Sequence, residues 1–296
     1  KFTEAPICGR IHCAKQWAEG CKLSANDVCG IFATGPVGPN FIGNMSAPLL
    51  GAKVVMLERF EAREALRLIE KERISVIGIV PTMLSKMIEA PDFDGYDLSS
   101  LRAVIVTGSP LPHNLALKGE EKMGPLLQVY GTVDYGGITA PHIDVSRDVR
   151  LFTVNRLMIG NRIKFLDDLG SEVVQGEAGE IVLKGPGCNA GFYKDPEATW
   201  QIWTEDGWFR TGDLGELDDE GNLIIVGRQK DIIIRGGQNI LPAEIENLLS
   251  EHPKVAHAAI VGMPDAVMGE KACAYVVLQE GQKLSFKEMV DALRGK

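Results

Sequence analysis

A glycine-rich segment that combines an aromatic ring with a carboxylate is the first candidate for chemistry. It reads VYGTVDYGG over residues 129–137 and follows a run typical of a β-strand. Tyr130 could stack on a base, Gly131 could let a phosphate approach the backbone, and Asp134 could hold magnesium. The alternative is a glycine-rich strand end with a solvated aspartate. The segment alone does not separate the two interpretations.

A second candidate, residues 107–112 (TGSPLP), lies at the carboxyl end of another predicted strand. Ligands of open α/β sheets bind at that edge. Because Gly108 has no side chain, a flat base could lie against the backbone there, bordered by Ser109 and Pro110. Ordinary turn chemistry would also explain this segment.

Two further runs decide between these interpretations. They are GWFRTGDL at residues 207–214 and GRQKDIIIRGGQNILPAEIE at residues 227–246. Both resemble the signature of the adenylate-forming (AMP-binding) superfamily, which includes acyl-CoA synthetases, firefly luciferase and the adenylation domains of peptide synthetases. The earlier segments, with 179–185 and 191–193, then follow in the order of that family. The resemblance extends from about Ala47 to the end of the chain.

The resemblance implies an acid–thiol ligase, an AMP-forming acyl-CoA synthetase. A carboxylate attacks the α-phosphate of ATP and pyrophosphate leaves. A thiol then displaces AMP from the acyl-adenylate, a far better acyl donor than a free carboxylate. The implied cofactors and partners are ATP, magnesium, coenzyme A and a small carboxylic acid, with a carrier protein as an alternative acyl acceptor.

The same resemblance assigns nucleotide-binding roles. Tyr130 packs on the adenine ring, which Gly108, Ser109 and Pro110 border. Asp213 accepts hydrogen bonds from both ribose hydroxyls, a charge-assisted arrangement. Arg228 reaches the ribose or phosphate from the other side. The alternatives are a turn aspartate for Asp213 and a surface ion pair for Arg228.

The loop around the implied magnesium ligand departs from the family pattern. Asp134 takes the place of the family's acidic magnesium ligand. Val133, however, stands where the family usually has a phosphate-binding threonine. Gly131 keeps the expected close approach to phosphate, and Thr132 supplies a hydroxyl only if the loop is shifted.

Residues of the second half-reaction follow. Lys230 aligns with the family hinge, about which the C-terminal domain swings between its two arrangements. Gly236 and Gly237 match the loop that lines the pantetheine tunnel of coenzyme A, where side chains would obstruct the thiol. A tight hairpin turn would require the same two glycines.

Two family elements are missing from this sequence. No Ser/Thr- and Gly-rich phosphate loop ending in Pro-Lys-Gly is present, and residues 35–38 (GPVG) lack the lysine and hydroxyls that such a loop needs. The late catalytic lysine is also missing. The resemblance therefore indicates a fragment that begins after the phosphate loop, and this polypeptide alone is expected to be inactive.

The positions of strand-like and helical runs predict an α/β fold. Short β-rich runs alternate with helical ones, which indicates a parallel sheet covered by helices. The expected strands are 54–57, 74–80, 103–107 and 126–129, and the expected helices are 61–72, 81–88 and 113–123.

Two further patterns of secondary structure follow in the sequence. Short strands with turns between them indicate a small antiparallel, β-barrel-like unit. A partial α+β C-terminal domain comes last, with a helix at 242–250 and a final helix that begins at Ser285, which has capping-box spacing to Glu288. The predicted domains are 1–146, the α/β subdomain of the large adenylation domain; 147–229, the β-barrel-like subdomain; and 230–296, the hinge and partial C-terminal domain.

Composition excludes several classes of function. The 296 residues are 45% hydrophobic and carry a net charge of −9, which disfavours nucleic acid as a partner. No apolar run approaches the roughly 20 residues that cross a bilayer, so we expect a cytoplasmic protein without a membrane span. Four of six cysteines lie near the N-terminus without CxxC spacing, which favours reduced thiols over a metal cluster.

Three functions stay open at this point. An acyl-CoA synthetase leads, an aryl-acid adenylating enzyme that loads a carrier protein is the nearest alternative, and a non-catalytic nucleotide-binding relative is the third. The acid and the oligomeric state are open as well. Residues 135–138 are expected to line part of the acid pocket.

Overall fold

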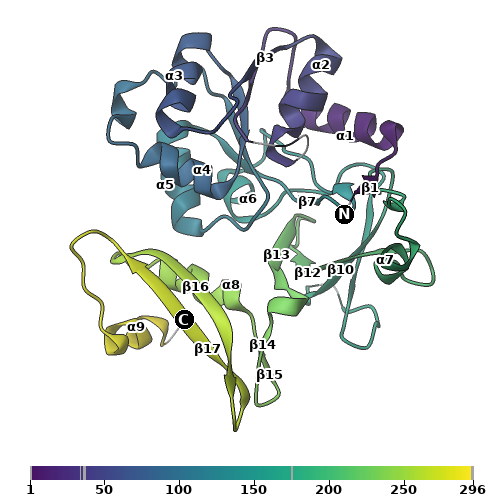
Figure 1. Ribbon diagram of the computed structural model, residues 1–296, viewed down its shortest axis with the longest axis vertical. Helices are drawn as coiled ribbons and strands as arrows, with labels where there is room; N and C mark the ends of the chain where they lie inside the picture. Colours follow the sequence, from purple (N-terminus) through teal and green to yellow (C-terminus); the bar gives the residue numbers. More distant parts are fainter. Residues whose placement is uncertain (1, 34, 36–37, 175, 295–296) are drawn as a thin grey trace.

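A computed structural model describes residues 2–33, 35, 38–174 and 176–294 (Figure 1). Three principal sheets follow one another along the chain, and their order agrees with the α/β expectation. Pro36 and Val37, of the proline–glycine segment considered above, lie outside the described residues. Among the described residues no helix is long and apolar enough to cross a membrane.

The first sheet is parallel and has five strands in the order β3-β2-β4-β5-β6. Its central strands β4 and β5 are buried along their whole length, as expected for a parallel sheet with helices on both faces. The predicted helices are confirmed, and α3 begins after Glu61, whose carboxylate accepts the N–H groups of Arg63 and Glu64. The elements are β2 (Val28–Ile31), β3 (Lys53–Met56), α3 (Ala62–Glu72), β4 (Val76–Ile79), α4 (Pro81–Ile88), β5 (Ala103–Val106), α5 (His113–Met123) and β6 (Leu126–Gln128).

The sequence pattern did not predict β2, nor the helix α1 (Ile7–Gly20) before it. Helix α1 buries mostly small residues around Trp17, whose ring meets Phe41 edge-on at 5.2 Å. Small buried residues give only a faint helical periodicity. Cys13, Cys21 and Cys29 are free thiols buried here, and no described group of three or more His, Cys, Asp or Glu residues could hold a metal ion.

The second sheet is antiparallel, as expected, in the order β13-β12-β10-β9. Within the described residues no pairing joins its edge strands, so it is an open sheet rather than a closed barrel. Its inner face buries Ile181, Leu183, Phe209 and Leu223. The strands are β9 (Arg162–Leu166), β10 (Gly179–Lys184), β12 (Phe209–Leu217) and β13 (Leu223–Arg228).

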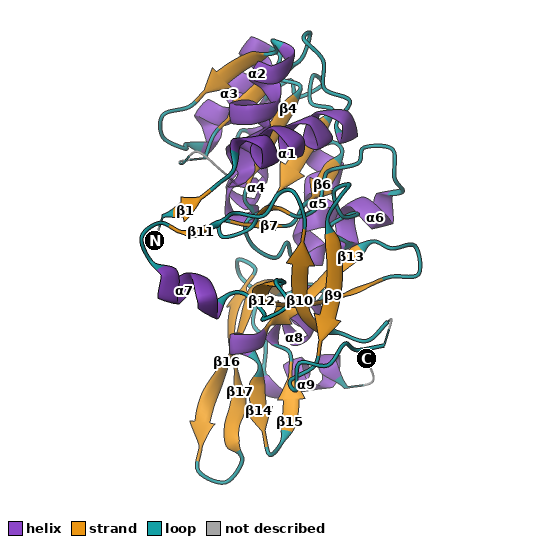
Figure 2. Cartoon of the chain, turned by 90° about the vertical axis from the view of Figure 1, so that its right-hand side faces the viewer, coloured by secondary structure: helices purple, strands orange, loops and turns teal. Residues whose placement is uncertain are grey.

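The third sheet, in the order β15-β14-β17-β16, carries two helices (Figure 2). Ser285 caps the last helix by accepting the Glu288 N–H, while the Glu288 carboxylate pairs with Lys254 at 2.5 Å. The elements are β14 (Ile233–Arg235), β15 (Gln238–Ile240), α8 (Pro242–Ser250), β16 (Val255–Asp265), β17 (Gly269–Leu278) and α9 (Phe286–Leu293).

Short elements connect these layers. The domain boundaries after residues 146 and 229 stay predictions. The short elements are β1 (Thr3–Glu4), the π-helical turn Ile42–Ser46, α2 (Ala47–Leu50), β7 (Gly131–Thr132), β8 (Gly136–Gly137), α6 (Arg147–Phe152), β11 (Gly191–Phe192), α7 (Pro196–Gln201) and the 3₁₀ turns Gly38–Asn40, Phe93–Gly95 and Gln229–Asp231.

Candidate nucleotide site

Three of the predicted site residues form one cluster, in which two side chains donate to the carboxylate of the third. The Tyr130 hydroxyl donates to Oδ2 of Asp213 at 2.5 Å, and Nε of Arg228 donates to Oδ1 at 2.7 Å. Tyr130 follows β6 of the parallel sheet, whereas Asp213 and Arg228 face each other across β12 and β13. The cluster therefore joins the parallel and antiparallel sheets.

The local backbone around Asp213 explains how its carboxylate is aimed. Gly212 has a φ of +68°, which a residue with a side chain rarely adopts. The Thr211 hydroxyl accepts the Asp213 N–H at 3.0 Å and donates to the Ile181 carbonyl at 2.8 Å, which ties this kink to β10. Asp213 is only 4% exposed, so a buried charge is held by two donors.

The electrostatics keep Tyr130 and Arg228 protonated. Burial, together with the adjacent Asp213 carboxylate, raises the pKa of Tyr130 well above its ordinary value, so the phenol stays a neutral donor. The same carboxylate raises the pKa of Arg228. Because a carboxylate offers about four acceptor sites and two are used, Asp213 retains capacity for two more donors.

The predicted adenine turn lies at the same sheet edge. Gly108, Ser109 and Pro110 are exposed directly after β5, and Gly108 has a φ of +95°. Strand β5 pairs in parallel with β6, the strand that leads to Tyr130. The carboxyl ends of neighbouring parallel strands bring this turn and Tyr130 to one edge.

Asp134 lies at the tip of the short hairpin formed by β7 and β8. Its side chain is half-buried and has no hydrogen-bond or ion-pair partner among the described residues. Mg²⁺ in nucleotide sites is usually held by one or two carboxylates together with substrate phosphates and water. An uncommitted carboxylate of this kind fits that requirement.

The other residues of this hairpin have structural partners. Thr132 accepts the Tyr135 N–H through its hydroxyl at 2.9 Å, which closes the turn around Asp134. A Cβ at Gly131 would come within 2.7 Å of the Gly136 carbonyl oxygen, so the two strands need glycine there. Val133 is 62% exposed, and its apolar side chain has no hydroxyl that could bind a phosphate.

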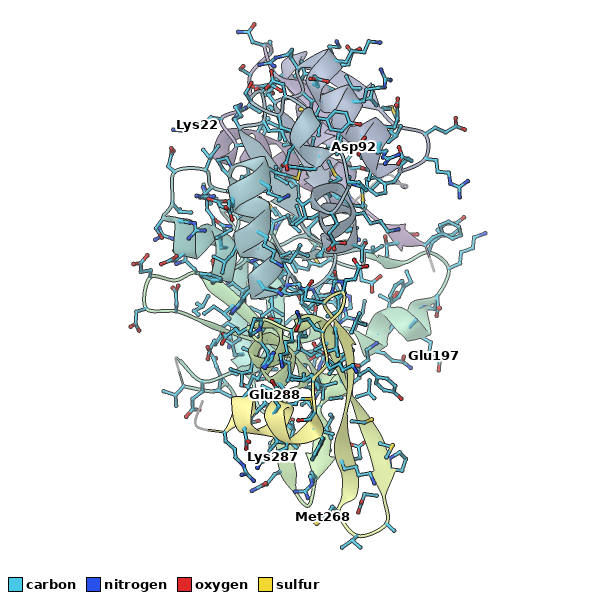
Figure 3. The ribbon with its side chains drawn as sticks, turned by 90° about the vertical axis from the view of Figure 1, so that its left-hand side faces the viewer. Lys22, Asp92, Glu197, Met268, Lys287 and Glu288 are labelled. Carbon is cyan, nitrogen blue, oxygen red and sulfur yellow. The ribbon has the colours of Figure 1, made fainter. Side chains whose placement is uncertain are left out.

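The predicted thioester residues lie outside this cluster in different ways: Lys230 is two residues beyond Arg228, and the two glycines lie on the third sheet. Lys230 is exposed in the turn between β13 and β14. Gly236 and Gly237, at φ +58° and +83°, form the tip of the β14–β15 hairpin, where the Gly236 N–H donates to the Met268 carbonyl at 2.8 Å. Met268, which this hairpin contacts, lies at the opposite end of the molecule from Lys22, a residue just after α1 in the N-terminal part of the chain (Figure 3).

The sequence missed the residues that support Tyr130. The Thr139 hydroxyl accepts the Tyr130 N–H at 2.8 Å and is fully buried.

Residues 135–138 were expected to line an acid pocket, but Tyr135 and Ile138 are fully buried in the core of the antiparallel sheet. The Tyr135 hydroxyl donates to Asn161 at 2.9 Å, so this tyrosine is held in the core.

Two protein-family models match this chain. Residues 31–193 match the AMP-binding enzyme family, and residues 244–296 match the AMP-binding enzyme C-terminal domain. The chain belongs to the AMP-binding enzyme family. The recognition made from the sequence is thereby confirmed.

Relatives in this family include several CoA ligases. Indoleacetate–CoA ligase of Aromatoleum aromaticum is 37% identical over 257 residues, which are 86% of this chain and 50% of that protein. The medium-chain fatty-acid–CoA ligase of Escherichia coli is 34% identical over 95% of this chain and 49% of its own length. The chain thus spans about half the length of the curated relatives it matches.

Solved structures share the fold over nearly the whole chain. The amide bond synthetase McbA from Marinactinospora thermotolerans superposes with a TM-score of 0.87 at 31% identity, covering 99% of this chain and 59% of that one. O-succinylbenzoate coenzyme A synthetase from Bacillus subtilis, in complex with AMP, gives a TM-score of 0.81 at 29% identity, with 98% and 58% covered.

Proposed function

We propose that the protein carrying this chain activates a carboxylic acid with ATP, through an acyl-adenylate, and transfers the acyl group to coenzyme A. The observation that carries the proposal is the convergence of Tyr130, Asp213 and Arg228. The names of the CoA ligases among its relatives support the same activity.

In this proposal the cluster binds the nucleoside of ATP. The two free acceptor sites of Asp213 take the ribose hydroxyls, a charge-assisted pair that is stronger than neutral hydrogen bonds. Tyr130 presents its ring to adenine while its hydroxyl stays on Asp213. The side chain of Arg228 is 53% exposed, so its guanidinium can bond Asp213 through Nε and still offer its other N–H groups to the nucleotide.

Asp134 would hold magnesium together with the phosphates of ATP. When bound, the metal neutralises charge that develops on the reacting phosphate. Gly108 to Pro110 would border the base, and Gly131 would let the phosphates approach the backbone of the hairpin. Thr132 stays the weakest assignment, since its hydroxyl already closes the turn.

The second half-reaction needs a movement about Lys230. Gly236 and Gly237 join β14 to β15, in a different sheet from β12, which carries Asp213 (Figure 1). We infer that the coenzyme A and nucleotide residues meet only after the C-terminal sheet rotates. Rigid-body rotation about a few residues is a common way for one pocket to use two sets of groups. We keep the domain limits 1–146, 147–229 and 230–296, and a cytoplasmic location, as parts of this proposal.

Acid-dependent ATP–pyrophosphate exchange by the full-length protein tests the first half-reaction. We expect exchange with at least one acid from a panel of aryl, indolyl and medium-chain aliphatic acids. Product analysis with coenzyme A, a phosphopantetheinyl carrier protein or an amine then identifies the acceptor. If AMP binds while no acid supports exchange, the chain is a non-catalytic nucleotide-binding relative.

A further inference from the structure

One buried residue holds the hairpin on both sides of Asp134, through its side chain on one side and its backbone N–H on the other. Nδ2 of Asn189 donates to the Val133 carbonyl at 2.7 Å, and the Asn189 N–H donates to the Tyr135 carbonyl at 3.1 Å. Asn189 is 2% exposed. The carbonyl groups of the two residues that flank Asp134 are therefore both held by a residue that lies more than fifty positions later in the chain.

Arg10 fixes the orientation of that amide. Its Nη2 donates to Oδ1 of Asn189 at 3.1 Å. An arginine can only donate, so the amide oxygen must face Arg10 and the NH₂ group must face Val133. The guanidinium fits because Gly136 has no side chain: a Cβ there would lie 2.9 Å from Nη1 of Arg10.

The backbones of α1, residues 186–187 and the Asp134 hairpin also approach one another closely. A Cβ at Gly9 of α1 would lie 2.3 Å from the Pro186 carbonyl oxygen, and a Cβ at Gly136 would lie 2.7 Å from the Gly187 carbonyl oxygen. At these two points α1 meets Pro186 and the Asp134 hairpin meets Gly187 at backbone distance, beside the side-chain contacts of Arg10 and Asn189. Such close packing leaves little freedom for the hairpin to shift.

We propose that Asn189 and Arg10 are positioning residues that direct the Asp134 carboxylate toward magnesium in the nucleotide complex. The inference rests on the magnesium role of Asp134 in the proposed function. Mg²⁺ accepts little deviation from octahedral geometry, so a fixed carboxylate binds it better than a mobile one. Outer-shell partners of metal ligands typically change metal affinity by about 10- to 100-fold.

Two substitutions of Asn189 separate the positioning of Asp134 from the effect of an added charge. Asn189→Asp keeps an oxygen toward Arg10 but removes the donor to Val133. Asn189→Leu removes both contacts at similar volume and adds no charge. We expect both to raise the magnesium concentration at half-saturation about 10-fold in calorimetric titrations of ATP binding, while AMP affinity without magnesium changes less than about twofold.

The matched control is Asn222→Asp. Asn222 is also a buried turn asparagine, 1% exposed, whose Nδ2 donates to Asp218 at 2.8 Å, but it lies in the β12–β13 turn rather than beside Asp134. Its substitution is expected to lower Tm and to leave the magnesium requirement unchanged. This control separates loss of stability from loss of metal positioning.

The outcomes are distinct from those that test the proposed function. Because ATP binding is measured without turnover, the positioning role can be tested even if no acid supports exchange. Unchanged half-saturation for magnesium in folded Asn189 variants overturns the proposal. A parallel loss of AMP affinity also overturns it, because the substitution would then deform the whole nucleotide site.

Discussion

The Asp213 cluster and the Gly236–Gly237 hairpin are built in opposite ways. Asp213 is buried and hydrogen-bonded to Tyr130 and Arg228, which come from two other strands or strand ends, so the groups proposed to bind the nucleoside are already assembled. The hairpin glycines are exposed, and the Gly236 N–H donates to the Met268 carbonyl in the neighbouring turn of the same sheet. In the proposed function, this difference means that nucleotide binding uses a preformed site, whereas the thioester step depends on movement.

The strongest test of the preformed site is Asp213→Asn. The substitution removes the charge that holds Arg228 and would accept the ribose hydroxyls. We expect AMP affinity to fall about 100-fold, or ~3 kcal/mol, because two hydrogen bonds to a charged group are weakened. Isothermal titration with AMP measures this. Asp219→Asn, an exposed turn aspartate, serves as the control, and equal affinities in the two variants would contradict a ribose role for Asp213.

The movable hairpin is tested by Gly237→Val. A Cβ at Gly237 would meet no atom within 4 Å, so the substitution strains the backbone at its φ of +83° without a clash in the present arrangement. We expect thioester formation to slow about 10-fold while pyrophosphate exchange stays within about twofold, since the loop acts only after adenylation. Single-turnover assays of each half-reaction distinguish the two. Equal losses in both would remove the contrast between the two regions.

Tyr130→Phe sharpens the comparison within the preformed site. The ring that would stack on adenine is kept, while the 2.5 Å hydrogen bond to Asp213 is lost. We expect AMP affinity to fall about 5- to 10-fold, or ~1 to 1.4 kcal/mol, which is the usual worth of one such bond. An effect as large as that of Asp213→Asn would mean that the hydroxyl, rather than the carboxylate, organises the cluster.

The smallest expected effect is a pH dependence from the same tyrosine. The pKa of Tyr130 is raised above its ordinary value of about 10, chiefly by burial. Because the pKa is higher in the folded protein, Tyr130 loses its proton first in the unfolded chain. The contribution of Tyr130 to the free energy of unfolding is therefore constant below about pH 10 and falls as pH rises above it. In urea unfolding, the stability of the wild type should therefore fall toward that of Tyr130→Phe as pH rises above about 10. Parallel curves would contradict the raised pKa.

The strands and helices of the parallel sheet were predictable because their apolar patterns are local. Residues 62–72 and 113–123 each fall within a predicted helix, and the buried runs of β4 and β5 could be recognised by composition. Strand β2 and helix α1 were missed because α1 buries small side chains, which leave a weak period. The acid-pocket expectation for Tyr135 failed since sequence position does not show which face of a hairpin is buried.

The sequence by itself determined the family and the order of the sheets, and it supplied the residues of the proposed nucleotide site, because short motifs carry their chemistry in adjacent positions. Only the tertiary structure decided that the Tyr130 hydroxyl meets Asp213, and that Asn189 and Arg10 hold the hairpin around Asp134. These contacts join residues 56 to 179 positions apart. Their existence depends on packing between sheets and helices, which no local pattern encodes.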